Sequence, residues 1–74
     1  MQSIKRTLTI GPRDRVTIRN RFNQERTGRA VMLGPAGWVL NMGGPHGTPA
    51  VATWETIVAV NSTRVSDEYP LAVV

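Results

Sequence analysis

The chain has 74 residues, no cysteine and a formal net charge of +4. A chain of this length forms one small domain, residues 1–74, and the lack of cysteine excludes a disulfide framework and a thiolate zinc site. No segment is long and apolar enough for a signal peptide or a membrane span, so we expect a cytoplasmic protein with no membrane partner.

The basic charge is concentrated in the first part of the chain. Residues 1–29 carry eight basic and two acidic side chains, a net charge of +6 (8 − 2), whereas residues 30–74 carry one basic and three acidic ones, a net charge of −2 (1 − 3). Nearly all the basic residues are arginine, whose planar guanidinium suits bidentate contact with phosphate or carboxylate. This asymmetry indicates an acidic partner, and a merely solvated surface is the alternative interpretation.

Two strands are predicted at the start of the chain. The first covers residues 3–10, where apolar and polar side chains alternate until Gly11 and Pro12 end the run. The second covers residues 14–22, "DRVTIRNRF", and alternates more cleanly. Its apolar side, expected in the core, consists of Val16, Ile18 and Phe22. Its polar side consists of Arg15, Thr17, Arg19 and Arg21.

Shorter strands are predicted after a polar loop over residues 23–28. The segment "RAVMLG" forms a third strand, and "PAG" makes a tight turn into "WVLNMG". After the "GGPHG" loop come "TPAVATW" and "ETIVAVNS", with a single 3₁₀ turn over residues 53–56. The tail, residues 63–74, ends in "LAVV", which is suited to pairing with an edge strand or a partner. The pattern predicts an all-β fold of five or six short strands.

The spacing of these strands and turns resembles that of the SH3-like small barrel over residues 14–62, with residues 3–10 as an added N-terminal strand. Within that class, "GPRDRV", "GRAV" and "HGTPAVATWETI" are similar to the layout of the type II dihydrofolate reductases, tiny barrels that are active as tetramers. The Val-Gln-Ile-Tyr run of that family would fall at residues 51–54, where this chain has "VATW", so its active site is not carried over.

The "GGPHGTP" loop and the "IVAV" ending also resemble small accessory proteins of phages that infect actinobacteria. This resemblance implies an accessory role, such as modifying host machinery, or a minor virion component. For such a protein the expected location is the cytoplasm of the host cell.

The loop that contains His46 matches no catalytic or metal-binding motif. It lacks the Lys and the following helix of a phosphate-binding P-loop. The chain has no second His and no Cys to complete a metal site with His46, and the nearest acid in sequence is Glu55. We therefore expect no enzyme activity, no metal and no cofactor, and interpret His46 as a turn residue, with a binding loop as the alternative.

Two of the aromatic residues have different expected roles. Trp38 is expected to pack in the core beside Phe22. Trp54 falls beside the 3₁₀ turn, where it either faces a ligand, as in many SH3-like barrels, or fills the bottom of the barrel.

The sequence predicts a small non-catalytic binding module that contacts nucleic acid or an acidic protein surface. The expected binding residues are Lys5, Arg15, Arg19, Arg21, Arg29, His46 and Trp54. The alternative is a structural or assembly subunit, in which the apolar termini add strands to neighbours and the chain forms a homo-oligomer or joins a larger assembly. An oligomeric enzyme with a pore-type site is the third possibility. It ranks last because the sequence contains no visible set of catalytic residues.

Overall fold

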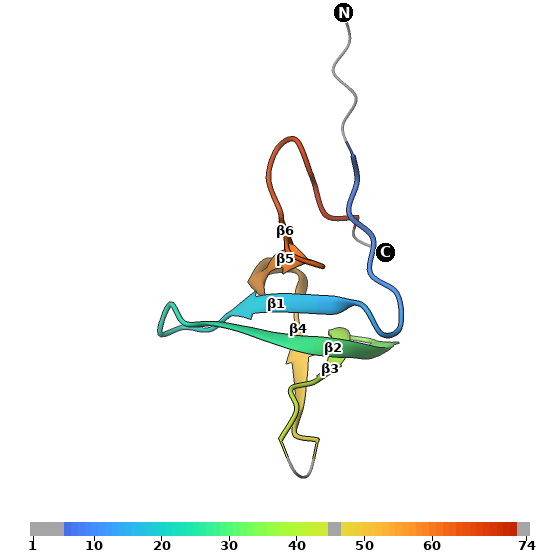
Figure 1. Cartoon of the computed structure of the whole chain (residues 1–74), viewed down its shortest axis with the longest axis vertical. Coiled ribbons are helices and arrows are strands. Elements are labelled where there is room, and N and C mark those ends of the chain that lie inside the picture. Colours follow the sequence, from blue (N-terminus) through green and yellow to red (C-terminus); the bar gives the residue numbers. More distant parts are fainter. Residues whose placement is uncertain (1–5, 45–46, 73–74) are drawn as a thin grey trace, which may run out of the picture.

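A computed structural model describes residues 6–44 and 47–72 (Figure 1). These residues form six strands in one antiparallel sheet and a single turn of 3₁₀ helix. The strands are β1 (Arg15–Arg19), β2 (Glu25–Gly34), β3 (Gly37–Asn41), β4 (Pro49–Ala52), β5 (Ile57–Val60) and β6 (Thr63–Arg64), and the 3₁₀ helix is η1 (Trp54–Thr56). The predicted all-β class and the predicted 3₁₀ turn are confirmed.

The sheet has the order β4-β3-β2-β1-β5-β6 and is strongly curled. In a flat sheet, β4 and β5 would lie about 19 Å apart, because four spacings of about 4.8 Å separate them. Only residues 53–56 connect them, and three of these form η1, whose rise is only about 2 Å per residue. The sheet must therefore bend to bring β4 and β5 together. It is not closed, so the SH3-like barrel remains a prediction.

Two irregularities in strand pairing help the sheet to bend. In the β2–β3 ladder the register shifts between Ala30 and Met32, and in the β1–β5 ladder it shifts between Thr17 and Ile18. An extra residue in one strand increases the local twist and bends the strand. The extra residues are Val31 in β2 and Val58 in β5, the two strands on either side of β1.

The hydrophobic core lies on the concave face of the curled sheet. Val16 and Leu40 are fully enclosed, and Trp38 is buried as expected. The buried cluster consists of Val16, Ala30, Trp38, Leu40, Ala52, Ile57 and Val60. Ala52 in β4 and Ile57 in β5 flank η1, so the cluster joins two strands that lie far apart in the order of the sheet. Trp54 is half-buried against this cluster, so it packs on the core.

The prediction that Phe22 lies in the core is wrong. β1 ends at Arg19, and Phe22 lies in the turn between β1 and β2, where it is 70% exposed. Asn20 ends the strand because its side-chain Oδ1 accepts hydrogen bonds from the backbone N–H groups of Phe22 and Gln24, at 2.9 and 3.0 Å. An Asn side chain that bonds to the backbone ahead of it favours a turn over a continuing strand.

The tight hairpin between β2 and β3 depends on Gly37. Its φ of +142° is one that other residues rarely adopt, and a Cβ atom there would collide with the backbone carbonyl of Ala52 in β4. Glycine therefore allows β3 to start directly against the end of β4. The predicted "PAG" turn is confirmed at this position.

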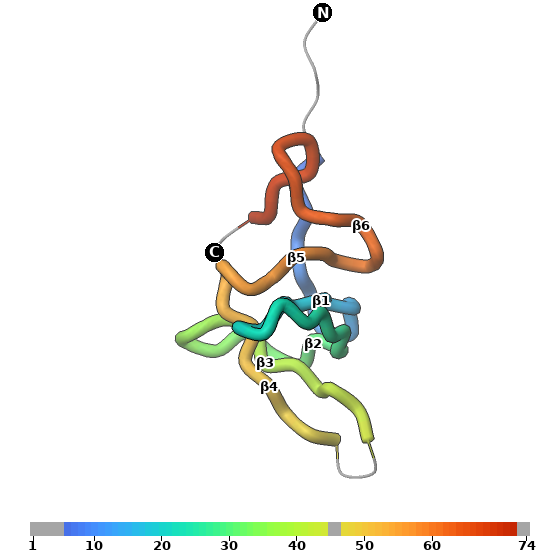
Figure 2. The backbone as a smooth tube through the Cα atoms, turned by 90° about the vertical axis from the view of Figure 1, so that its left-hand side faces the viewer, coloured from blue at the N-terminus to red at the C-terminus, as the bar shows by residue number. Residues whose placement is uncertain are grey.

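The two ends of the described chain pair with each other beside the sheet. Leu8 and Leu71 form an isolated parallel bridge, and the Leu8 N–H donates to the Pro70 carbonyl at 2.8 Å. Figures 1 and 2 show these segments running together at the end of the molecule opposite the β3–β4 hairpin. In the described part of the expected strand over residues 3–10, Leu8 alone forms a β-bridge, and that segment is not a strand of the sheet.

Candidate functional site

The outer face of β1 and β2 carries three pairs of polar side chains. In the antiparallel register, Arg15 lies opposite Arg29, Thr17 opposite Thr27, and Arg19 opposite Glu25. Side chains alternate along a strand, so these pairs share one face while Val16 points into the core. The sequence predicts that Arg15, Arg19 and Arg21 share one exposed strand face; the structure places Arg15 and Arg19 on it, whereas Arg21 lies beyond the end of β1.

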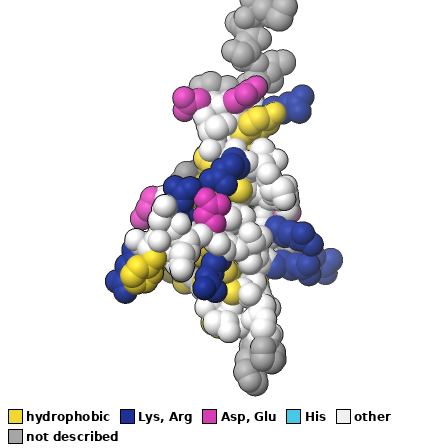
Figure 3. All heavy atoms as spheres, turned by 60° about the vertical axis from the view of Figure 1, so that its left-hand side comes forward, with side chains coloured by type: hydrophobic (Ala, Val, Ile, Leu, Met, Phe, Trp, Pro, Cys, Tyr) yellow, Lys and Arg dark blue, Asp and Glu magenta, His cyan; other side chains and the backbone are white. Residues whose placement is uncertain are grey.

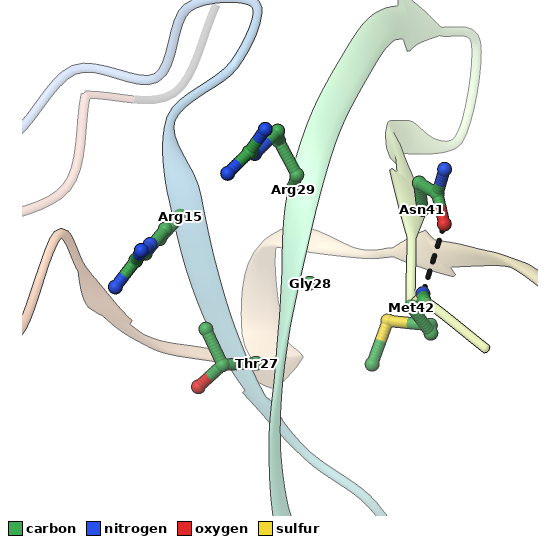
Figure 4. A pocket seen from close by; sticks show the side chains of 7 residues that line it. Arg15, Thr27, Gly28, Arg29, Asn41 and Met42 are labelled. Atoms are coloured by element: carbon green, nitrogen blue, oxygen red, sulfur yellow. Dashed lines mark hydrogen bonds between the residues drawn. The ribbon is translucent and has the colours of Figure 1, made fainter. Parts of the chain in front are cut away.

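Arg15 and Arg29 line a groove of about 460 Å³ on this face. Their guanidinium groups project to the same side of the β1–β2 ribbon (Figure 4). Directly opposed residues have Cβ atoms about 4.5–5.5 Å apart, so the two arginine side chains leave the sheet side by side. Among the residues that the structure describes, neither arginine forms an ion pair. The groove thus offers two cationic donor groups to one anion.

The backbone of Arg15 is held in place by Asn61, which lies in the turn between β5 and β6. The Asn61 N–H donates to the Arg15 carbonyl at 2.8 Å, and the Arg15 N–H donates to Asn61 Oδ1 at 2.9 Å. Asn61 and Ser62 have φ values of +50° and +71°, as the two central residues of a type I′ turn require. Sequence reasoning missed this positioning role, although an Asn-Ser pair after an apolar strand is a turn signal.

Gly28 is the residue of β2 that lines the groove between Thr27 and Arg29, and its core side leaves no room for a side chain. Gly28 is buried in the middle of β2, and a Cβ atom there would lie 2.5 Å from Met42 Sδ and 3.1 Å from the Asn41 carbonyl oxygen. Asn41 forms the far wall, and its Oδ1 accepts a hydrogen bond from the Gly43 N–H at 2.8 Å, drawn as a dashed line in Figure 4. The close approach of β3 to β2 on the core side of the groove therefore depends on Gly28.

Arg19 is engaged by Glu25, which also binds Arg64. Arg19 Nη2 lies 2.7 Å from Glu25 Oε2, and Arg64 Nη1 and Nη2 donate to Glu25 Oε1 and Oε2 at 3.1 and 3.0 Å. The hydrogen bonds from Arg64, followed by that from Arg19, lower the pKa of Glu25 from 4.5 to about 2. The same contact with Glu25 raises the pKa of Arg64. This cluster ties β1, β2 and β6 together and carries a net charge of only +1.

The remaining predicted binding residues are scattered. Arg21 lies beyond the end of β1, in the turn, with its guanidinium carbon 5.1 Å from the centre of the Phe22 ring. Trp54 lies in η1 against the core. Lys5 and His46 lie outside the described residues. Figure 3 shows the basic side chains in separate groups, with a carboxylate against one of them. Among the predicted binding residues that the structure describes, Arg15 and Arg29 line one groove together.

An exposed apolar row crosses the same sheet beyond the bulge in β2. Met32 pairs with Val39, and Val39 pairs with Val51, so three apolar side chains stand side by side across three strands. Met32 is 57% exposed and Val51 is 52% exposed. The sequence pattern did not reveal this row, because the bulge shifts the register by one residue and changes which side chains of β2 face outward.

Comparison of the chain with family models, with curated proteins and with solved structures gives no match. The resemblances to SH3-like barrels, to phage accessory proteins and to type II dihydrofolate reductases therefore stay predictions. Within residues 6–44 and 47–72, no helix is long and apolar enough to cross a membrane. Over the same residues, no three His, Cys, Asp or Glu side chains gather as they would around a metal ion.

Proposed function

We propose that the protein is a small non-catalytic binding module that contacts the phosphates of nucleic acid through the outer face of β1 and β2. The observation that carries this proposal is the direct opposition of Arg15 and Arg29. Like charges opposite each other destabilise a sheet, so the pair does not serve folding. A phosphate between the two guanidinium groups would accept charge-assisted hydrogen bonds from both and remove their repulsion.

The rest of the face favours nucleic acid over an acidic protein. The hydroxyl groups of Thr17 and Thr27 hydrogen-bond to each other at 2.8 Å in the next row, which leaves one hydroxyl hydrogen to donate to a neighbouring phosphate. In the third row, the ion pair with Glu25 partly neutralises Arg19. The opposed arginines, the threonine hydroxyls and Arg19 therefore follow one another along the ribbon. A regular polyanion matches such a row, and the +6 charge of residues 1–29 supports attraction over a longer range.

The fold that we propose for this module is an SH3-like barrel that is open on one side. The strand order, the curl of the sheet and the 3₁₀ turn between β4 and β5 support this assignment. In such a scaffold the outer face of the β1–β2 ribbon is rigid, because Asn61 fixes the backbone of Arg15 and the Glu25 cluster fixes the far end.

A double variant tests the proposed function. Arg15→Gln with Arg29→Gln removes two contacts of about 1.5–3 kcal/mol each, so binding to DNA or RNA should weaken at least about a hundredfold. The slope of log K against log salt should become less steep by about two units, since each phosphate contact contributes nearly one. The matched control is Arg6→Gln with Arg26→Gln, which removes the same charge from the terminal segment and from the other side of β2.

The outcomes distinguish the possible partners. Equal weakening by the two double variants would indicate that net charge alone drives binding and would overturn the proposal. Binding of the parent to polyglutamate, with none to DNA or RNA, would assign the face to an acidic protein. Neither double variant should be less stable than the parent, because all four arginines are exposed, and Arg15→Gln with Arg29→Gln should be slightly more stable because it removes the repulsion between the opposed arginines.

The second candidate function is a structural or assembly subunit, and the row of Met32, Val39 and Val51 favours it. Exposed apolar groups that stand together mark contact surfaces more often than single ones do. The termini are less suited to joining neighbours than expected, because the segments around Leu8 and Leu71 pair with each other. In this reading the row is the contact between copies of the chain.

A further inference from the structure

We propose that Phe22 stacks on an unpaired nucleobase, so that the nucleic acid recognised by this module is single-stranded. The inference rests on the proposed function and extends it from phosphate contact to the class of ligand. Its starting observation is that Phe22, the only phenylalanine, is 70% exposed, more than any other large apolar side chain of the described residues.

The turn that carries Phe22 is held by a network of hydrogen bonds. Asn20 Oδ1 accepts from the backbone of Phe22 and of Gln24, the Asn20 N–H donates to the Gln24 carbonyl at 2.9 Å, and the Asn23 N–H donates to the Asn20 carbonyl at 3.0 Å. Asn23 adopts a positive φ of +63°, as a tight turn requires. Figure 1 shows this turn projecting beyond the sheet at its left edge. Phe22 is thus presented by an ordered backbone.

The Arg21 side chain covers one face of the Phe22 ring. The Arg21 guanidinium lies over the Phe22 ring, 5.1 Å from its centre. One guanidinium covers one face of a ring at most, so the high exposure of Phe22 leaves the second face open to solvent. An open aromatic face next to an arginine is the arrangement with which single-strand-binding proteins hold bases, because every base has a π-face and a phosphate nearby.

The position of Phe22 fits one strand that follows the ribbon. From Arg15 to Arg19, where β1 ends, the chain advances about 13 Å, at about 3.3 Å per residue, and the turn that follows carries Arg21 and Phe22. Along this path come the Arg15–Arg29 pair, the threonine hydroxyls, Arg19 and then the aromatic tip. Positive charge at both ends of the path favours a polyanion over an apolar pocket of a protein partner. The phosphates would lie on the face and a base at the tip.

A duplex does not offer the same contact. Its bases are already stacked and paired, and freeing one of them requires a few kcal/mol of unstacking. In the described part of the chain, no group beside the Phe22 ring is placed to supply this energy. Stacking of Phe22 should therefore favour a single strand over a duplex of the same length.

The experiment compares substitutions at the tip. Phe22→Ala should weaken binding to a short oligothymidine or oligouridine about fivefold to a hundredfold, and leave binding to a duplex of the same length unchanged. Phe22→Leu should be as weak as Phe22→Ala, and Phe22→Tyr should bind like the parent, because the contact requires an aromatic face. Met32→Ala is the matched control, since it removes another exposed apolar side chain away from the tip. Fluorescence of an oligonucleotide that contains 2-aminopurine should be quenched by the parent and not by Phe22→Ala.

Each result decides for or against stacking. Parent-like binding by Phe22→Ala would overturn the inference, while weakening by Arg15→Gln with Arg29→Gln would leave the proposed function standing. Parent-like binding by Phe22→Leu would show an apolar anchor and overturn stacking. Tighter binding of the parent to duplex than to single strands would overturn the ligand class. Absence of all binding to nucleic acid would overturn both proposals.

Discussion

Arg15 of β1 lies directly opposite Arg29 of β2, and the same ladder places Arg19 directly opposite Glu25 two rows away. One ladder therefore contains a matched and an unmatched pair of charges. The matched pair is bonded at 2.7 Å and reinforced by Arg64, as a pair that stabilises the sheet should be. The unmatched pair lines a groove. This contrast is the reason to connect Arg15 and Arg29 with binding rather than with folding.

Arg29→Glu should have opposite effects on stability and on binding. It places an opposite charge across from Arg15, which stabilises a cross-strand pair by about 0.2–1 kcal/mol relative to an uncharged one, so the free energy of unfolding should rise. Binding to nucleic acid should be lost, because the groove loses one cation and gains an anion. Urea denaturation and fluorescence anisotropy measure the two effects.

Arg6→Glu is the matched control for this substitution, because it changes the net charge equally at an exposed position in the terminal segment. It should weaken binding slightly and leave the free energy of unfolding unchanged. A decrease in stability on Arg29→Glu would contradict the interpretation that the two arginines repel each other.

Glu25 should make the stability of the protein depend on acid pH. Its pKa is about 2 in the folded chain, against 4.5 for a free side chain, since Arg64 and Arg19 hydrogen-bond to the carboxylate. A group with a lowered folded pKa stabilises the fold above the unfolded pKa, and this contribution is lost as the pH falls from about 4.5 to about 2. Thermal unfolding across this range should show a decreasing midpoint.

The variant Glu25→Gln should flatten this pH dependence, and Glu55→Gln, at an exposed position in η1, is the control that removes one carboxylate outside the cluster. An NMR titration of the Glu25 side chain reports the same pKa directly. If the pH dependence of the midpoint were the same in Glu25→Gln as in the parent, the cluster would not be the cause.

The sequence predicted the fold class and several turns because local rules decide them. Alternation in β1, the "PAG" hairpin with Gly37 and the 3₁₀ turn after β4 depend on neighbouring residues, and all three are present. The curl of the sheet is a different matter. It depends on bulges in β2 and β5, and a bulge is a property of two paired strands that one strand does not reveal.

The candidate site was predicted less completely, for the same reason. Arg15 and Arg29 were both named as binding residues, but their opposition follows from the register of β1 and β2, which the turn at Asn20 determines. In the sequence, the alternation of apolar and polar side chains runs on past Asn20 to Phe22, and for this reason Phe22 is wrongly predicted to lie in the core. The pairing of Arg19 with Glu25 and Arg64 requires β6, which is far away in sequence.

Gly37 and Gly43 should respond differently to alanine, although both have positive φ values. Gly43 faces open space, so Gly43→Ala should lower the free energy of unfolding only by the strain of its backbone, about 1–2 kcal/mol. Gly37→Ala should lower it by more, because the added Cβ also collides with the Ala52 carbonyl and forces β3 and β4 apart. Urea denaturation of the two variants measures the difference. Equal losses would show that β3 can shift away from β4 without penalty.

Val51→Asp should separate copies of the chain if the apolar row is the contact between them. Val51, Val39 and Met32 stand side by side, and burying an unpaired carboxylate against their counterparts in a second copy is strongly unfavourable. We expect the parent to sediment as a dimer or larger at high concentration and Val51→Asp to sediment as a monomer, with little loss of stability, since Val51 is 52% exposed. Phe22→Asp places the same charge at an exposed apolar position far from the row, and should associate like the parent. A monomeric parent at every concentration would remove the support for an assembly subunit and leave the arginine face as the surface to test.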